Sequence, residues 1–153
     1  MRANALGGHA MTTDYDQDFY AWSREQSSLL RSGQYGRLDV MHLVKEIEDL
    51  GKQERRALES RLAVLLGHLL KWQYQPENPS RKSWSATINT KRRAIAKLLD
   101  ENPSLAARFD EIIRDAYPDA IDLAVAETPL DYDAFPERCP WDQTQIRGTF
   151  LPG

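Results

Sequence analysis

The chain has 153 residues, of which 41% are hydrophobic and 28% are charged, and its formal net charge is −3 at pH 7. These values are typical of one globular domain, and they exclude a chain that is disordered throughout or basic over its whole surface. The single cysteine excludes an internal disulfide and a zinc site built on several cysteines, and it favours a reducing compartment. No apolar run approaches the roughly 20 residues that span a bilayer, so we expect a cytoplasmic protein without membrane contact.

The chain begins without a pattern of secondary structure. Residues 1–10 lack an apolar stretch long enough for a signal peptide, and Met11 offers a second start, so we expect residues 1–12 to form a disordered extension. Residues 13–153 are predicted to fold as a single helical domain.

Helical periodicity dominates the first half of this domain. A first helix is predicted over residues 15–31, where apolar residues recur at spacings of three and four, and two glycines follow it. A second is predicted over residues 39–50, with a stripe spaced 3, 4, 3 at Val40, Leu43, Ile47 and Leu50. Gly51 either kinks this helix or separates it from a third, over residues 53–75. The third helix has the strongest pattern and is typical of the middle of a bundle, with apolar residues at Leu58, Leu62, Leu65, Leu69 and Trp72.

Prolines divide the second half. Pro76 and Pro79 end the third helix, because proline lacks a backbone donor and crowds the preceding turn. A fourth helix is predicted through residue 100, a fifth from Pro103 to 116, and a short sixth from Pro118 to about 127. The tail after residue 128 carries four of the eight prolines and several aromatic residues, so we expect it to pack on the helices. The predicted fold is all-α, a compact bundle of five to six helices with an irregular aromatic and proline-containing C-terminal tail packed on it.

Several polar side chains fall where the periodicity calls for apolar ones. His68 lies beside the stripe of the third helix, His42 and Glu46 share one face of the second, and an inward position of the fourth falls on Lys91 or Arg92. One hypothesis is a buried network in which Glu46 neutralises Arg92 and His68 donates to an oxygen. The other is a divalent metal, such as zinc, iron or nickel, held by His42, Glu46 and His68. Apart from that metal, we expect no cofactor.

Two further groups of residues could carry chemistry. Basic residues surround Trp84 at the start of the fourth helix and could bind phosphates while the indole stacks on a base: Arg81, Lys82, Lys91, Arg92, Arg93 and Lys97. No recognition motif accompanies them, and Trp84 begins the inward stripe of its helix, so we expect a solvated face and no nucleic-acid partner. Cys139 has no histidine nearby in the sequence, which predicts a structural role.

Four segments carry a family resemblance: LVKEIEDLG at residues 43–51, GHLLKWQYQP at 67–76, Ser83-Trp84 with Ile88 and Arg92, and Cys139-Pro140-Trp141 with Phe150 and Pro152. In this order and spacing, over about residues 14–152, they resemble the bacterial family called domain of unknown function 29. The resemblance implies a compact helical bundle and no established activity, substrate or cofactor. His42 lies outside the family pattern, and Lys45 replaces an expected acidic residue, which argues against a carboxylate-rich metal site.

The positions that match the family pattern predict a polar cluster near the third helix, with Glu46, Glu48, His68, Lys71 and Arg92 as its members and Trp72 and Trp84 as its aromatic walls. We interpret the chain as a non-catalytic accessory or protein-interaction module that contacts protein, either itself or another. The alternative is a metal-dependent or acid-base enzyme in which Glu46 and His68 act as ligands or proton carriers. A second alternative is a nucleic-acid-associated protein that uses the basic start of the fourth helix.

Overall fold

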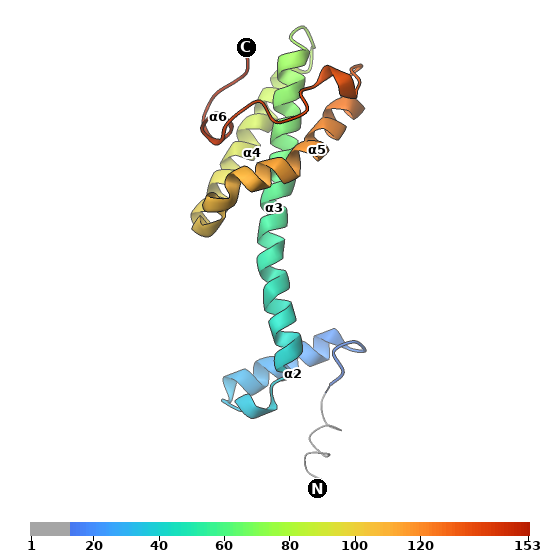
Figure 1. Cartoon of the computed structure of the whole chain (residues 1–153). Coiled ribbons are helices and arrows are strands. Elements are labelled where there is room, and N and C mark those ends of the chain that lie inside the picture. The colour runs from blue at the N-terminus through green and yellow to red at the C-terminus, as the bar shows by residue number, and fades with distance from the viewer. Residues whose placement is uncertain (1–12) are drawn as a thin grey trace. The chain divides into compact units, whose positions relative to one another are not determined.

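The computed structural model describes residues 13–153, and this part of the chain is all-α and contains no β-strand (Figure 1). Its α-helices are α2 at Phe19–Arg31, α3 at Val40–Tyr74, α4 at Arg81–Glu101, α5 at Phe109–Glu127 and α6 at Gln143–Arg147. Short 3-10 helices lie at Tyr35–Arg37, Pro103–Arg108 and Tyr132–Ala134. The disordered extension predicted for residues 1–12 lies outside the described residues. None of the described helices is both long and apolar enough to cross a membrane.

The chain divides into two compact units, residues 1–51 and 52–153. The first unit holds α2 and the beginning of α3, and the second holds the rest of α3 together with α4, α5, α6 and the tail. The single domain predicted over residues 13–153 stays a prediction.

In the first unit, α2 is fixed at both ends. At its start, the Asp18 carboxylate accepts a hydrogen bond from the backbone N–H of Ala21 at 2.9 Å. At its end, Gly33 adopts a φ of 74°, and the N–H groups of Gly33 and Gln34 donate to the carbonyls of Leu30 and Leu29. This is a Schellman motif, and glycine suits it because a side chain would be strained at that φ.

Side chains of α2 hold the beginning of α3. The buried Gln26 accepts the backbone N–H of Asp39 at 2.8 Å, and the Trp22 indole N–H donates to the Asp39 carboxylate at 3.0 Å. Trp22, Gln26 and Leu29 are the buried residues of α2, spaced four and three apart as the predicted first helix requires.

Two predicted helix breaks are absent from the structure: the separation at Gly51, one of the two alternatives for that residue, and the start of a sixth helix at Pro118. α3 runs through Gly51 as one helix of 35 residues, because a single glycine costs only about 1 kcal/mol in a helix and no atom crowds this one. Pro118 lies inside α5 and does not begin a sixth helix. The proline removes one hydrogen bond, but the buried Ala116, Tyr117 and Ala120 around it keep the helix packed.

The second unit contains the main hydrophobic core. In Figure 1, α4 and α5 lie against the last turns of α3, and the chain after α5 runs back over them. The leucines predicted to line the third helix, from Leu58 to Leu69, are fully buried. Phe135, Trp141 and Ile146 belong to the same core, which confirms that the tail packs on the helices. Gly67 marks the closest approach of α3 to α5, because a Cβ atom there would lie 2.8 Å from a methyl group of Leu123.

Candidate functional site

The predicted polar cluster is distributed over both units. His42, Glu46 and the exposed Glu48 belong to the first unit, whereas the second contains His68, Lys71, Trp72, Trp84 and Arg92. The residues of the predicted cluster therefore belong to two local arrangements, one in each unit.

In the second unit, Lys71 is the most deeply buried charge, with 2% of its surface exposed. Its ammonium group forms an ion pair with Glu127 of α5 and lies 4.8 Å from the centre of the Trp84 ring. A buried cation needs such partners, since removing either would leave the charge poorly compensated. Lys71 and Glu127 are 56 positions apart in the sequence, which explains why no sequence spacing indicated this pair.

His68, one turn before Lys71, is 8% exposed. Its Nδ1–H donates to the carbonyl of Val64 at 2.8 Å, which is the bond to a backbone oxygen that the network hypothesis expects. Burial lowers the pKa of His68, so the neutral imidazole prevails at neutral pH. A neutral, buried imidazole next to a paired lysine is well suited to fixing the packing of α3.

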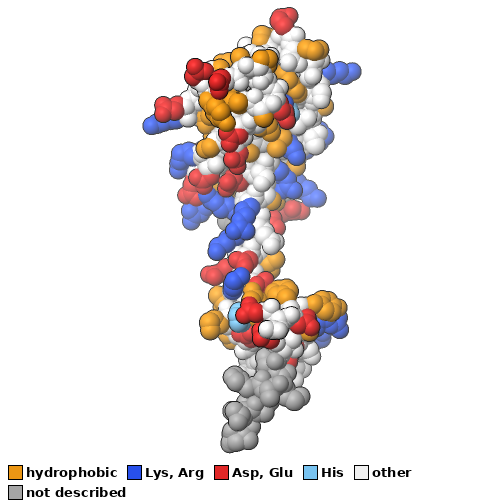
Figure 2. All heavy atoms as spheres, turned by 90° about the vertical axis from the view of Figure 1, so that its right-hand side faces the viewer, with side chains coloured by type: hydrophobic (Ala, Val, Ile, Leu, Met, Phe, Trp, Pro, Cys, Tyr) orange, Lys and Arg blue, Asp and Glu red, His pale blue; other side chains and the backbone are white. Residues whose placement is uncertain are grey.

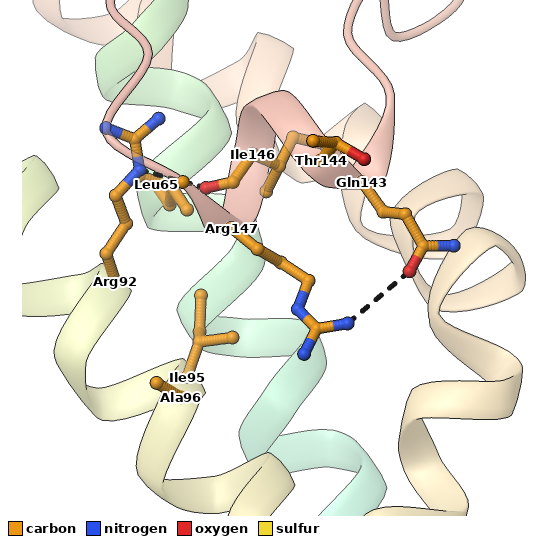
Figure 3. Close-up of a pocket in the computed structure, with 9 residues that line it drawn as sticks. Leu65, Arg92, Ile95, Ala96, Gln143, Thr144, Ile146 and Arg147 are labelled. Carbon is orange, nitrogen blue, oxygen red and sulfur yellow. Dashed lines mark hydrogen bonds between the residues drawn. The ribbon is translucent and has the colours of Figure 1, made fainter.

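Arg92 makes bonds that the sequence did not predict. Its Nε–H donates to the carbonyl of Ile146 at 2.9 Å, and its Nη2 donates to the carbonyls of Gln145 at 3.0 Å and Phe150 at 2.6 Å. Figure 3 shows the guanidinium reaching from α4 to α6. Arg92 therefore holds the tail in place through backbone acceptors. The two predicted aromatic walls also have separate partners, because the Arg81 guanidinium lies 3.7 Å above the Trp72 ring while Trp84 faces Lys71.

A cavity of about 390 Å³ lies beside Arg92, between α4 and α6 (Figure 3). Leu65 and Ile95 form part of its apolar lining, and Arg147 crosses it to reach the side-chain oxygen of Gln143 at 3.5 Å. Its lining contains two arginines but no carboxylate, histidine or cysteine. The cavity thus lacks an acid-base pair of its own.

In the first unit, His42 and Glu46 both contact Tyr15, a residue that the sequence analysis did not single out. The Tyr15 ring stacks on the His42 imidazole with 3.9 Å between centroids, and its hydroxyl donates to Glu46. The Nδ1 of His42 lies 2.7 Å from the Asp39 carboxylate. Burial would raise the pKa of Asp39, but hydrogen bonds from His42 and Trp22 hold it below its ordinary value. These contacts join Tyr15, and Trp22 of α2, to the beginning of α3, and only one ring nitrogen of His42, Nδ1, takes part in them.

The metal triad of His42, Glu46 and His68 stays a prediction. Two of its members lie in the first unit and the third in the second. Within residues 13–153, no group of three His, Cys, Asp or Glu side chains is arranged to hold a metal ion.

The first unit also exposes an apolar face. Four apolar side chains of α3 are each about half exposed or more, and Ile47 reaches 65%. We call these four residues the apolar face: Val40, Val44, Ile47 and Leu50. Apolar residues that recur at this spacing along a helix are usually buried. Nine of the eleven large hydrophobic side chains exposed in the described part of the chain belong to this unit, and Figure 2 shows hydrophobic atoms gathered on its surface.

Comparison with known proteins identifies a family for the chain but no activity. Residues 15–151 match the model of a family described as "Domain of unknown function DUF29". The match confirms the resemblance noted from the segments around Glu46, His68 and Trp84. No curated protein and no solved structure matches the chain.

Proposed function

We propose that this chain, which belongs to the DUF29 family, is a non-catalytic interaction module that binds protein through the apolar face of its first unit. The observation that carries the proposal is the exposure of Val40, Val44, Ile47 and Leu50 on one side of a regular helix. The proposal places the protein in the cytoplasm, where Cys139 stays reduced.

The spacing of the apolar face separates it from ordinary surface exposure. Scattered exposed leucines or valines are normal, whereas apolar residues that recur every three or four positions form a continuous strip along a helix. On α3, the step from Val40 to Val44 is four residues and the step to Ile47 is three. A strip of this kind is stable in water when another protein surface covers it.

The buried polar residues support a structural role over catalysis. His68 and Lys71 are both buried, and each has a partner within the protein. An acid-base enzyme would need these groups to face a cleft that admits substrate. The cavity near Arg92 is lined by neither His68 nor Lys71, and its lining contains no acid-base pair.

The contacts of the basic residues give little support to nucleic-acid binding. Trp84 is 7% exposed and faces Lys71, so its ring is poorly placed to stack on a base. Arg81 stacks on Trp72, and Arg92 is bonded to the tail. We therefore favour the apolar face as the surface that a partner covers.

The proposal is tested by placing a photoreactive amino acid at Val44 and, as a control, at the exposed Gln53 on the same helix. After illumination in the cell, Val44 should form a covalent adduct with protein, which mass spectrometry identifies, and Gln53 should form little or none. The absence of an adduct at Val44, or equal yields at the two positions, would contradict the proposal.

A further inference from the structure

We infer that a second copy of this chain covers the apolar face, so that two first units pair as a four-helix bundle. Each copy would contribute α2 and the beginning of α3 to this bundle. The inference rests on the proposed function, because it names the protein that the apolar face binds.

The first unit has too small a core to stand without cover. Its buried side chains, among the described residues, are Trp22, Gln26 and Leu29, and one of these three is polar. The described part of this unit, residues 13–51, has about 40 residues, and domains of that size usually need a disulfide, a metal or oligomerisation to be stable. The single cysteine of the chain, Cys139, lies outside this unit, so a disulfide within it is impossible. Oligomerisation supplies the missing core.

The exposed apolar area is large enough for a stable dimer. The four side chains of the apolar face are 49–65% exposed. At on the order of 150–200 Å² for each residue, they present roughly 400 Å², close to the apolar share, about 57%, of the roughly 800 Å² that each partner contributes to a standard interface. The apolar face of α3 would form the centre of this interface, with the exposed Glu48 and Lys52 of the same helix toward its rim.

The pattern on α3 is that of a helix with neighbours on two sides. Leu43, half-buried, adds to the apolar face, so that apolar residues recur at steps of three, one, three and three from Val40 to Leu50, a spacing that also occurs on the inward faces of helices in four-helix bundles. Tyr15, just before α2, and Trp22 of α2 cover a different side of α3, where the rings of both contact His42. A second helical hairpin with the same pattern would cover the side that α2 leaves open.

The charges beside the apolar face suit pairing with an identical surface. Glu48 and Lys52 are both exposed along α3, four residues apart, and they carry opposite signs. In a two-fold symmetric dimer the same patch meets itself, so a patch of one sign would repel its copy. A flank with both signs avoids this repulsion and allows each copy to offer an opposite charge to the other.

The inference is tested by sedimentation equilibrium of the full chain over a wide range of concentrations. The wild type should have twice the chain mass of 17.6 kDa. Ile47→Glu should raise the dimer dissociation constant by about a hundredfold or more, because each copy would place a charge in the apolar centre. Gln53→Glu adds the same charge to an exposed position of α3 away from the apolar face and should leave the dissociation constant unchanged. Helical circular dichroism shows whether the variants fold, and Val44→Lys replaces Ile47→Glu if that variant does not.

The outcomes separate this inference from the proposed function. A wild type that stays monomeric would overturn self-association, and the proposed function would survive if the Val44 probe then formed an adduct with a different protein. A folded Ile47→Glu variant that dimerises as tightly as the wild type would also overturn the inference. A monomeric wild type with no adduct at Val44 would refute both.

Discussion

Two glycines of α3 allow the packing of the second unit to be tested with one kind of substitution. At Gly67, an alanine Cβ would lie 2.8 Å from the Leu123 Cδ2 atom and 3.1 Å from the backbone oxygen of Ala120. At Gly51, nothing lies within 4 Å of the added atom. The gain in helix propensity is similar at both positions, so the difference between the two variants measures the contact between α3 and α5.

The expected magnitudes follow from these distances. Gly51→Ala should stabilise the protein by up to about 1 kcal/mol, through helix propensity alone. Gly67→Ala gains the same propensity but overpacks the interface, at a cost of about 2–3 kcal/mol, because the carbonyl of Ala120 is held by its helix and cannot move aside. We therefore expect Gly67→Ala to lower the free energy of unfolding by about 1–2 kcal/mol.

Urea unfolding followed by circular dichroism measures both variants. The Leu123→Ala background provides a further check, because it removes the methyl group nearest to the new Cβ and should reduce the cost of Gly67→Ala. If Gly67→Ala stabilised the protein as much as Gly51→Ala, the close approach of α3 and α5 would be refuted.

Three other substitutions test the polar contacts. Lys71→Met should change the free energy of unfolding by less than about 1 kcal/mol, because methionine keeps the buried aliphatic part of the side chain. Lys71→Ala should lower it by about 2–3 kcal/mol, because alanine leaves a cavity. Equal losses of the two variants in urea unfolding would contradict this prediction. Because the pKa of His68 is lower in the folded protein than its ordinary 6.5, the unfolded chain binds the proton first as pH falls. Stability should therefore drop as pH falls below about 6.5 and through the folded pKa, and His68→Gln should reduce this drop; an unchanged pH profile would count against the burial of His68. Arg92→Met should lower the free energy of unfolding by about 2–4 kcal/mol, because three carbonyls of the tail lose their hydrogen-bond donor. Amide hydrogen exchange in α6 should become faster, and unchanged exchange there would show that Arg92 does not hold the tail.

The sequence predicted those parts of the fold that depend on periodic burial. The leucines from Leu58 to Leu69 indicated the core helix correctly, and the aromatic residues of the tail indicated its packing. The separation offered at Gly51 and the start predicted at Pro118 are absent for different reasons. A single glycine costs only about 1 kcal/mol in a helix, whereas the helix around Pro118 is held by the packing of Ala116, Tyr117 and Ala120.

The candidate sites were less predictable. The bond from His68 to Val64 spans one helical turn and follows from local geometry, whereas the ion pair of Lys71 with Glu127 joins distant helices. Arg92 binds backbone carbonyls, which every residue has and which therefore leave no trace in a pattern of side chains. The apolar stripe of the second predicted helix was identified correctly as a pattern, but periodicity cannot tell whether the surface that covers it belongs to the same chain.

Amide hydrogen exchange at low and high protein concentration tests most directly whether a second copy covers the first unit. We predict that protection of the amides in Phe19–Arg31 and in the first turns of α3 rises with concentration, because dimer formation stabilises this small unit. Protection around Leu65 and Leu69, in the core of the second unit, should change far less. The lower concentration is chosen so that the mass of the protein there is that of a monomer. Equal protection of the first unit at the two concentrations would then contradict self-association through the apolar face.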